Sequence, residues 1–457
     1  MKIFSADYVL PISADLIENG AVVVDETRIA AIGTREELIE KFPEAAAEHF
    51  GEAVIMPGLV NCHSHLEITA MRGFLDDVEA DFYSWLMKLT TVRGEKLTAA
   101  DVKIAALAGA LEGARAGVTC FGDIGRFGVA GFEALKTNGL RGILFQETEF
   151  SPDDKTAAED FTKLKDKFLE LKATETELVK VGLSPHAPYT VSRRLFEKIT
   201  DYAVAENIEI SIHAAESNQE RDFFETGEGF FAELYQKLNL EWNAPKKSPV
   251  EYLADLGVLQ AAPLLAHGVK VSDADINLIA ASRSKIAHCP KSNAKFGHGI
   301  APLERFLDKN VCVGFGSDSV ASNNVCDILE EARFATLSAR NLPDKKRFLT
   351  AREIIETATL GGANALGLGR EVGSLETGKQ ADLIVVSLEN IAQQPLHDVY
   401  SAILFASNAR DVLLTMVAGA ELYRDGAATK VDEAEIKRRM KEIGAKMCRQ
   451  SEKSGRS

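Results

Sequence analysis

Short runs of apolar residues alternate along most of the chain with longer stretches of mixed polarity. One such stretch, residues 97–117, repeats its apolar positions with the spacing of a helix and ends at Gly117. Strands separated by helices indicate βαβ units and a parallel sheet. Eight short runs therefore predict an α/β fold built on a (β/α)8 TIM barrel. The runs are residues 53–60, 118–124, 141–147, 179–186, 208–214, 263–269, 284–290 and 311–318.

The two ends of the chain differ from the middle, because both carry β-rich runs around polar turns. Residues 21–33 place a charged turn between apolar runs, and residues 373–387 and 411–426 again combine apolar runs with polar turns. We therefore expect one small β-sandwich domain built from both chain ends. The predicted division is 1–56 for its first part, 57–369 for the barrel, 370–430 for its second part and 431–457 for a C-terminal helix and tail.

The charge balance limits the expected partners. Sixty-eight acidic residues against 52 Lys and Arg give a formal charge of −16, so the basic surface that binds nucleic acid or anionic lipid is not expected. Asp7 and Asp15 interrupt the N-terminal apolar residues, and no run of about 20 apolar residues follows. Scattered cysteines without CxxC spacing fit reduced thiols. These features predict a cytoplasmic protein and leave a homo-oligomer open.

A metal-binding or ionisable residue stands at or just beyond the end of every short run. In barrel enzymes the active site forms at the C-terminal ends of the strands. We therefore expect these side chains to meet at one mouth of the barrel. They are His63, His65, Asp123, Glu147, His186, His213, His267, His288 and Asp318.

Four of these residues predict a metal site. His63 and His65 are two positions apart in an extended segment, so both imidazoles face the same side. Taken alone, the pair is more typical of solvent-facing or capped histidines than of a metal site. His213 and Asp318 add a third imidazole and a carboxylate from other strand ends. This donor set suits catalytic Zn²⁺, and Fe²⁺ or Mn²⁺ also fits it.

Other polar residues are candidates for proton transfer or substrate contact. Glu216 follows His213 by three residues and is expected to turn back over the metal, although a carboxylate at a helix N-terminus is the alternative. His267 is expected to hold or deprotonate the reacting water, unless it is a core histidine. His186, between two prolines, is expected to contact substrate. The remaining histidines at positions 49, 298 and 397 are expected to be structural or exposed.

The motifs together resemble the amidohydrolase superfamily over nearly the whole chain. The motifs are PGLVNCHSHLE, SPHAPYT, HAAES, LLAHGV, AHCPKSN, GIAPL, GSDSVASNN and GKQADLIVV, in the expected order. The chain looks most similar to the adenosine-type deaminases of methylthioadenosine, S-adenosylhomocysteine and aminodeoxyfutalosine. The resemblance implies one metal ion held by His63, His65, His213 and Asp318. It also implies that Glu216, His267 and Asp318 surround the reacting water.

The substrate residues follow the family less closely. Methylthioadenosine and S-adenosylhomocysteine deaminases tend to carry two arginines near the third strand, whereas this chain has Arg141 and then Gln146. Their ribose-binding acid aligns ambiguously with Gly94 or Glu95. The motifs HSHLE, AHCPKSN and SDSVASN look similar to aminodeoxyfutalosine deaminases of menaquinone synthesis. Substrate contacts are expected from His186, Glu67, Arg141, Asn293 and Ser322.

The aromatic-rich segment 217–255 also resembles an insert of the aminodeoxyfutalosine deaminases. It is expected either to form a lid over an aromatic substrate or to be a helical excursion packed on the barrel.

The predicted function is hydrolytic deamination of a 6-aminopurine nucleoside to the 6-oxo product and ammonia, most specifically of aminodeoxyfutalosine. Metal-activated hydroxide is expected to attack C6 while Glu216, initially protonated, donates to ring N1. His267 and Asp318 are expected to steer and deprotonate the water. The alternatives on this scaffold are a methylthioadenosine/S-adenosylhomocysteine deaminase, a guanine deaminase and a triazine chlorohydrolase. A catalytically silent binding homologue is the alternative from a different class.

Overall fold

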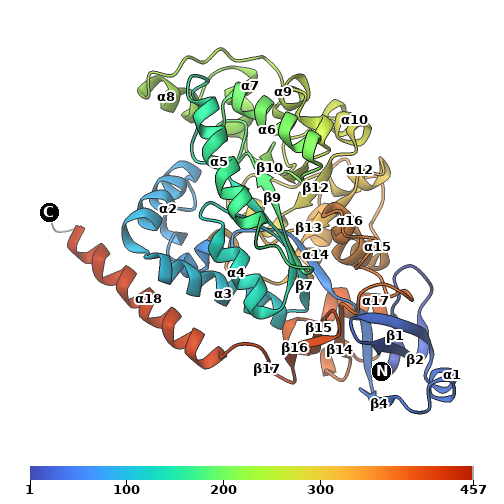
Figure 1. Ribbon diagram of the computed structural model, residues 1–457. Helices are drawn as coiled ribbons and strands as arrows, with labels where there is room; N and C mark the ends of the chain where they lie inside the picture. Colours follow the sequence, from blue (N-terminus) through green and yellow to red (C-terminus); the bar gives the residue numbers. More distant parts are fainter. Residues whose placement is uncertain (455–457) are drawn as a thin grey trace.

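The computed structural model describes the backbone of residues 1–454 and the side chains of residues 1–448. The predicted C-terminal helix is α18 (Glu433–Ser454), and Lys446 on it forms an ion pair with Asp101 of α3 (Ala99–Arg115). Residues 455–457, the end of the predicted helix and tail at 431–457, lie outside the described residues. In Figure 1 the red helix α18 runs past α3 on the outside of the barrel.

Eight parallel strands form the centre of the molecule. They are β6 (Leu59–Ser64), β7 (Val118–Gly125), β8 (Arg141–Glu147), β9 (Val179–Ser184), β10 (Ser211–Ala214), β11 (Leu264–His267), β12 (Lys285–His288) and β13 (Val313–Phe315). Continuous ladders join them, in chain order, into two half-sheets of four strands. Single parallel bridges link the half-sheets at both seams, between Leu183 and Ile210 and between Ser64 and Asp318. This order of strands is that of a (β/α)8 barrel, and the predicted fold class is confirmed.

Helices follow the strands and cover the outer face of the barrel (Figure 1). Besides α3 they are α4 (Val129–Asn138), α5 (Ala157–Lys172), α6 (Arg193–Glu206), α10 (Asp273–Ser282), α12 (Leu303–Asp308), α14 (Ile328–Ala339), α15 (Ala351–Glu356), η4 (Thr357–Gly361) and α16 (Gly362–Ala365). Helix α3 is the helix predicted at 97–117. It begins at a capping box, in which Asp101 accepts from the backbone N–H of Thr98 and the Thr98 hydroxyl accepts from the N–H of Asp101.

The first predicted strand, residues 53–60, is in fact two strands. Residues Ala53–Pro57 form β5, which pairs with strands from the chain ends, and the barrel strand β6 begins at Leu59. Gly58 separates them at a tight crossing, because a Cβ there would lie 2.1 Å from Oγ1 of Thr119. One apolar run therefore serves two sheets, which periodicity alone did not indicate.

The two chain ends share one nine-stranded sheet. Its strands are β1 (Lys2–Val9), β2 (Ile17–Asp25), β3 (Arg28–Thr34), β4 (Ala46–His49), β5, β14 (Leu383–Ser387), β15 (Val412–Val417), β16 (Ala420–Arg424) and β17 (Ala427–Ala428), with helix α1 (Arg35–Lys41) after β3. Strand β5 lies between β1 and β14 and so joins the N-terminal and C-terminal strands. The sheet has its own apolar core around Phe4, Ile55 and Leu383. The predicted domain boundaries stay a prediction.

Two further segments lie at the C-terminal ends of the barrel strands. The first holds η1 (Leu66–Met71), η2 (Asp76–Val78) and α2 (Phe82–Lys96), and the second holds α7 (Asn218–Glu225), α8 (Phe230–Lys237), α9 (Pro249–Asp255) and η3 (Val258–Ala261). The rings of Tyr83 and Phe230 lie 4.1 Å apart between their centroids and bring α2 against α8. Inside the second segment Phe223 stacks on Trp242 at 4.1 Å. Residues 217–255 are thus a helical excursion with an aromatic core, and they also contact α2.

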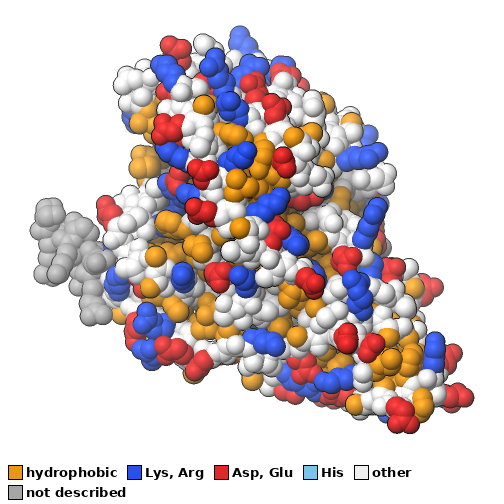
Figure 2. Space-filling model, in the orientation of Figure 1, with side chains coloured by type: hydrophobic (Ala, Val, Ile, Leu, Met, Phe, Trp, Pro, Cys, Tyr) orange, Lys and Arg blue, Asp and Glu red, His pale blue; other side chains and the backbone are white. Residues whose placement is uncertain are grey.

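The remaining short helices are α11 (Pro290–Lys295), α13 (Val320–Asn323), η5 (Ile391–Gln393), α17 (Val399–Ser401), η6 (Ala402–Ala406) and η7 (Ala409–Asp411). Within the described residues, no helix is both long and apolar enough to cross a membrane. Figure 2 shows a face of the molecule on which acidic, basic and hydrophobic side chains are interspersed.

Candidate active site

The predicted metal ligands lie at the C-terminal ends of barrel strands. His63 is in β6, His213 is in β10, and Asp318 lies three residues beyond β13. The backbone N–H of Asp318 donates to the carbonyl of His63 at 2.9 Å, so neighbouring strand ends hold the two side chains side by side. Asp318 and His267 have positive φ angles of 54° and 77°. Such conformations are uncommon for residues other than glycine and cluster at functional sites.

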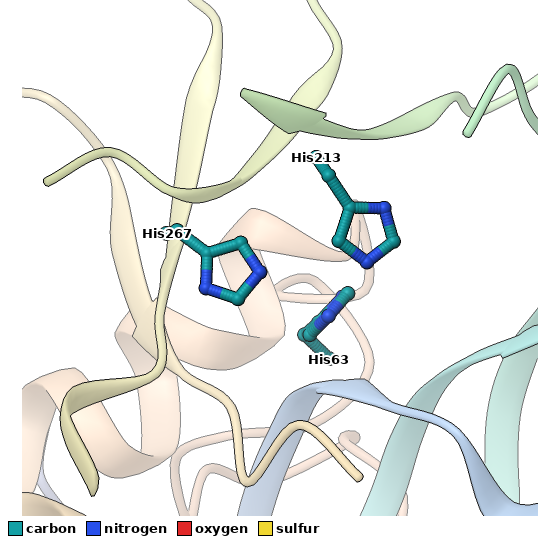
Figure 3. A group of neighbouring side chains, drawn as sticks. All are labelled: His63, His213 and His267. Carbon is teal, nitrogen blue, oxygen red and sulfur yellow. The ribbon is translucent and has the colours of Figure 1, made fainter. Parts of the chain in front are cut away.

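All four predicted ligands converge. Nε2 of His63 and Nε2 of His65 each lie 3.5 Å from Oδ1 of Asp318. Nε2 of His65 lies 3.2 Å from Nε2 of His213. Figure 3 shows the rings of His63, His213 and His267 pointing toward one another, and one ligand atom from each lies within 4.8 Å of the others.

His63, His65 and Asp318 have the charge states that a divalent metal requires. His63 is fully buried, its Nδ1 has no hydrogen-bond partner in the described part of the chain, and its Nε2 faces Asp318 at 3.5 Å. Burial lowers the pKa of His63 to about 4 and the pKa of His65 well below its usual value. Burial raises the pKa of Asp318, but the facing imidazole of His63 outweighs it and holds that pKa well below its usual range. Neutral imidazoles and an ionised carboxylate fit a zinc-type site.

Glu216 faces the same cluster. Its Oε1 lies 3.8 Å from Nε2 of His267 and 3.5 Å from Nε2 of His298. Burial alone would raise the pKa of Glu216, but these two imidazoles outweigh burial and lower it to about 2. Glu216 is therefore ionised at neutral pH. The two neighbouring histidines therefore favour the ionised form of Glu216 over the protonated form that was predicted.

His298 was expected to be structural or exposed, and it is buried next to the candidate site. It is 4% exposed and packs against the rings of Phe82 and Phe296, at centroid distances of 5.1 and 5.3 Å. Its imidazole faces the carboxylate of Glu216. Nothing in the spacing of His298 indicated this contact, because the residue follows no barrel strand directly.

Glu220 holds the backbone that carries Glu216, and sequence reasoning missed it. Its carboxylate accepts hydrogen bonds from the N–H groups of Ala215 (3.0 Å) and Glu216 (2.7 Å). Ala215 has a positive φ of 53°, so this turn is stabilised by a side chain and not by a glycine. Ser217 caps helix α7 by accepting from the N–H of Glu220. The S-x-x-E pattern at 217–220 was the signal available in the sequence.

His186 is the one predicted substrate residue that lines the cavity beside the metal ligands. Its Nδ1 bonds to the hydroxyl of Thr190 at 2.8 Å. Its Nε2 lies 4.0 Å from Oε1 of Glu147, which also lines the cavity. This arrangement leaves Nε2 facing the open space.

Three other predicted substrate residues lie outside the lining of the cavity and bond to neighbouring residues. Asn293 bonds through Oδ1 to Nδ1 of His267 at 2.9 Å, and Ser322 donates to Oδ2 of Asp318 at 3.0 Å. Glu67 accepts from the backbone N–H groups of Phe127 (3.1 Å) and Gly128 (2.6 Å). Neither Glu67, Asn293 nor Ser322 lines the cavity. Each of them bonds to a neighbouring residue, and their predicted contacts with substrate stay a prediction.

Arg141 lies at the wrong end of its strand for substrate binding. It begins β8, whereas Glu147, which lines the cavity, ends that strand. Its guanidinium forms a buried bidentate pair with Asp382, with Nε–Oδ2 at 2.7 Å and Nη2–Oδ1 at 3.0 Å. The prediction that Arg141 binds substrate is therefore wrong, and its role is to join the barrel to the terminal sheet.

The cavity over the cluster has about 100 Å³ and two unlike walls. The strand ends supply a polar wall. Helix α2 and the residues after α11 supply an aromatic wall of Phe82, Trp85 and Phe296. A flat heteroaromatic ring can pack against this wall while its polar edge faces the histidines and carboxylates.

The whole constellation lies inside a segment that matches a known family. Residues 54–422 match the model of the amidohydrolase family. The chain belongs to this family. Residues 20–45 also match an imidazolonepropionase-like composite domain of bacteria. The predicted class, a hydrolase of the amidohydrolase kind, is confirmed.

Relatives of similar length carry deaminase names. The chain is 30% identical over 440 residues to a 5-methylthioadenosine/S-adenosylhomocysteine deaminase of Thermodesulfovibrio yellowstonii, covering 95% of this chain and 96% of that protein. It is 33% identical over 422 residues to a 5′-deoxyadenosine deaminase of Methanobrevibacter smithii, covering 91% of each.

Solved structures show the same architecture. A zinc-bound adenosine deaminase from Xanthomonas campestris superposes with a TM-score of 0.85 at 27% identity, covering 97% of this chain and 98% of that one. An aminofutalosine deaminase of Helicobacter pylori, in complex with methylthio-coformycin, superposes with a TM-score of 0.77 at 25% identity, covering 93% and 100%.

Proposed function

We propose that this amidohydrolase is a metal-dependent deaminase of 6-aminopurine nucleosides. The observation that carries the proposal is the convergence of His63, His65, His213 and Asp318 beside Glu216 and His267 at one cavity. The deaminase names of the relatives support the same reaction class. Zinc is the metal we propose, because three nitrogen donors and one carboxylate suit it and the Xanthomonas neighbour holds it.

When bound, a divalent cation of this kind makes a water molecule acidic enough to supply hydroxide near neutral pH. Glu216 is placed to receive the proton that the water loses, because its ionised carboxylate lines the cavity. Glu216 then donates that proton to ring N1 as the water oxygen adds to C6 of the purine. Negative charge does not build up on the ring, which is the usual gain from general acid catalysis.

His267 and Asp318 flank the reacting water from the other side. Asn293 fixes the ring of His267 through Nδ1, so that Nε2 faces the cavity. Ser292 and Ser322 both donate to Oδ2 of Asp318, at 2.6 and 3.0 Å, and leave Oδ1 toward the histidines. This arrangement suits removal of the second proton, from the hydroxyl now bonded to C6, and its delivery to the departing amino group. Loss of ammonia leaves the 6-oxo purine.

Within this class we propose aminodeoxyfutalosine as the substrate, and hence a role in menaquinone biosynthesis. The structural likeness to the Helicobacter aminofutalosine deaminase supports this choice. Gln146, which stands where a second arginine is expected, turns its amide to the backbone carbonyls of Arg126 (3.0 Å) and Glu147 (3.1 Å). Methylthioadenosine and S-adenosylhomocysteine are the second candidates, because the Thermodesulfovibrio relative carries their name.

The test is ammonia release from a substrate panel. The zinc-loaded protein is incubated with adenosine, 5′-deoxyadenosine, methylthioadenosine, S-adenosylhomocysteine, aminodeoxyfutalosine and guanine. We expect the highest kcat/KM with aminodeoxyfutalosine. Clear preference for guanine would overturn the nucleoside proposal. Absence of ammonia from every compound would favour a silent binding homologue.

A further inference from the structure

Glu331, a fully buried glutamate of α14, links two segments that follow different barrel strands. Each oxygen of its carboxylate accepts a hydrogen bond from one of these segments. Oε2 accepts the backbone N–H of Lys291 at 3.1 Å, and Oε1 accepts the side-chain amide of Asn323 at 2.6 Å. Lys291 is in α11, which follows β12, and Asn323 ends α13, which follows β13. One buried carboxylate therefore joins α11 to α13.

The two segments also carry the hydroxyl groups that orient Asp318. Ser292 follows Lys291 in α11, and Ser322 precedes Asn323 in α13. Both hydroxyls donate to Oδ2 of Asp318, at 2.6 and 3.0 Å. Each serine is the chain neighbour of a residue that bonds to the buried glutamate. The glutamate therefore fixes the backbone on which both hydroxyl donors stand.

Further hydrogen bonds from the same two segments reach the site. The side-chain amide of Asn323 donates to the carbonyl of Ser317, the residue before Asp318, at 2.6 Å. This backbone needs support, because Asp318 has the uncommon positive φ of 54°. In α11, Asn293 bonds to Nδ1 of His267 at 2.9 Å. The segments that the glutamate joins thus hold a predicted metal ligand and the histidine beside it.

A metal ligand keeps its orientation through the residues that bond to it, and losing such an outer contact typically lowers metal affinity or activity by about 10- to 100-fold. We propose that Glu331 is a positioning residue, which acts through Ser292 and Ser322 to hold Asp318 in the orientation that binds the metal ion. The inference rests on the proposed metal-dependent function. It adds to the site a residue that does not line the cavity.

The alternative is that Glu331 only stabilises the fold by pairing with the ammonium of Lys291. That ammonium lies 3.0 Å from Oε1 of Glu330, which is half-buried, and 3.9 Å from Oε1 of Glu331. Burial raises the pKa of Glu331 to about 8, with Lys291 as the group that most opposes this. A buried charge whose partner lies closer to another carboxylate is a weak source of stability. The hydrogen bonds to α11 and α13 account better for its place.

The test measures zinc affinity and stability in parallel. Glu331→Gln keeps the shape of the side chain but places an amide NH2 opposite one of the two N–H donors, so one hydrogen bond is lost. Zinc affinity, measured on metal-free protein in competition with a chromophoric chelator, should fall by about 10- to 100-fold. With zinc saturating, kcat should fall by about tenfold while KM stays within about threefold. The midpoint of urea unfolding of the metal-free variant should stay near wild type, because the variant no longer buries a charge.

Two further variants sharpen the comparison. Glu330→Gln is the matched control, because Glu330 pairs with the same ammonium of Lys291, while in the described part of the chain its carboxylate bonds to no backbone N–H of α11 or α13. It should leave zinc affinity within about twofold of wild type. Asn323→Ala removes the bond to Ser317 but leaves the bond between Glu331 and Lys291 in place. We expect weaker zinc binding in this variant as well.

The outcomes separate this inference from the proposed function. A lower unfolding midpoint in Glu331→Gln, with zinc affinity and kcat unchanged, would make Glu331 purely structural and overturn the inference. Equal weakening of zinc binding in Glu330→Gln would overturn it too, since the effect would then belong to the side chain of Lys291. If Glu331→Gln does not fold, unchanged zinc affinity in Asn323→Ala overturns the inference.

If wild-type protein binds zinc tightly but releases no ammonia from any adenine nucleoside, the proposed function fails, and the comparison of zinc affinities still decides the role of Glu331. Wild-type protein that binds no zinc would overturn both.

Discussion

The carboxylate of Glu220 accepts the backbone N–H of Glu216 at 2.7 Å, so one buried acid positions another. Glu216 extends from a turn that has no glycine, and the second oxygen of Glu220 accepts the N–H of Ala215 in the same turn. Burial raises the pKa of Glu220 to about 8, while the neighbouring imidazoles lower the pKa of Glu216 to about 2. The pKa values of these two glutamates, four residues apart, are thus shifted in opposite directions by their surroundings.

Replacing Glu216 tests the proton-transfer role. Glu216→Gln keeps the shape of the side chain but cannot accept a proton from water and pass it to N1. We expect kcat to fall by about 10²–10⁴-fold, with KM changed much less. Steady-state ammonia release at saturating and limiting nucleoside separates the two constants. Near-normal turnover in this variant would remove Glu216 from the mechanism.

Replacing Glu220 tests whether this residue positions Glu216. Glu220→Gln places an amide NH2 or an oxygen opposite two N–H donors, so one hydrogen bond is lost and the turn at Ala215 relaxes. We expect kcat to fall by at least about tenfold while KM stays within about threefold, and the free energy of unfolding to fall by about 1–3 kcal/mol. Glu225→Gln, on the exposed face of the same helix, is the matched control. A loss of stability without a change in kcat would assign Glu220 a purely structural role.

The histidine cluster predicts how stability depends on pH in metal-free protein. His63 has a folded-state pKa of about 4, below its usual 6.5, so the unfolded chain binds more protons between these values. Keeping His63 neutral costs no stability above about pH 6.5. As the pH falls from 6.5 toward 4, the free energy of unfolding decreases by about 3 kcal/mol, because the unfolded chain binds a proton at His63 that the folded chain does not. Urea unfolding of the metal-free protein at pH 7, 5.5 and 4.5 measures this decrease in the free energy of unfolding. His63→Gln should show a shallower decline, and identical slopes for the two proteins would contradict the burial of a neutral imidazole.

Replacing Arg141 tests whether this residue stabilises the fold through Asp382 and does not bind substrate. Both side chains are buried, so Arg141→Met leaves an unpaired carboxylate between the barrel and the terminal sheet. We expect the free energy of unfolding to fall by about 3–5 kcal/mol. Chemical denaturation measures it, and kcat/KM of the folded variant should stay near wild type.

Arg438→Met removes an exposed ion pair on α18 and is the control that should leave stability nearly unchanged. A specific rise of KM in Arg141→Met, without loss of stability, would return Arg141 to the substrate site.

The barrel and the cluster of His63, His65, His213 and Asp318 could be predicted from the sequence because both depend on local order along the chain. Each barrel strand is a short apolar run, and His63, His213 and Asp318 stand at or just beyond the ends of such runs. Parallel strands in chain order bring those ends to one mouth, so the position of a residue along its strand predicted its place in space.

The residues missed or misplaced depend on contacts that no local pattern encodes. Arg141 opens its strand instead of ending it, and its partner Asp382 is 241 residues away. His298 meets Glu216 only because the chain after α11 folds back over the mouth. A pattern of polar and apolar positions along the chain does not predict such tertiary contacts.

Anomalous X-ray diffraction at the zinc edge, on crystals of zinc-loaded protein, shows whether these four side chains hold one metal ion. We predict one peak of near-full occupancy, bounded by the imidazoles of His63, His65 and His213 and the carboxylate of Asp318, with a coordination position left open toward Glu216. A peak held by other residues, or no peak after loading with zinc, iron or manganese, would contradict it.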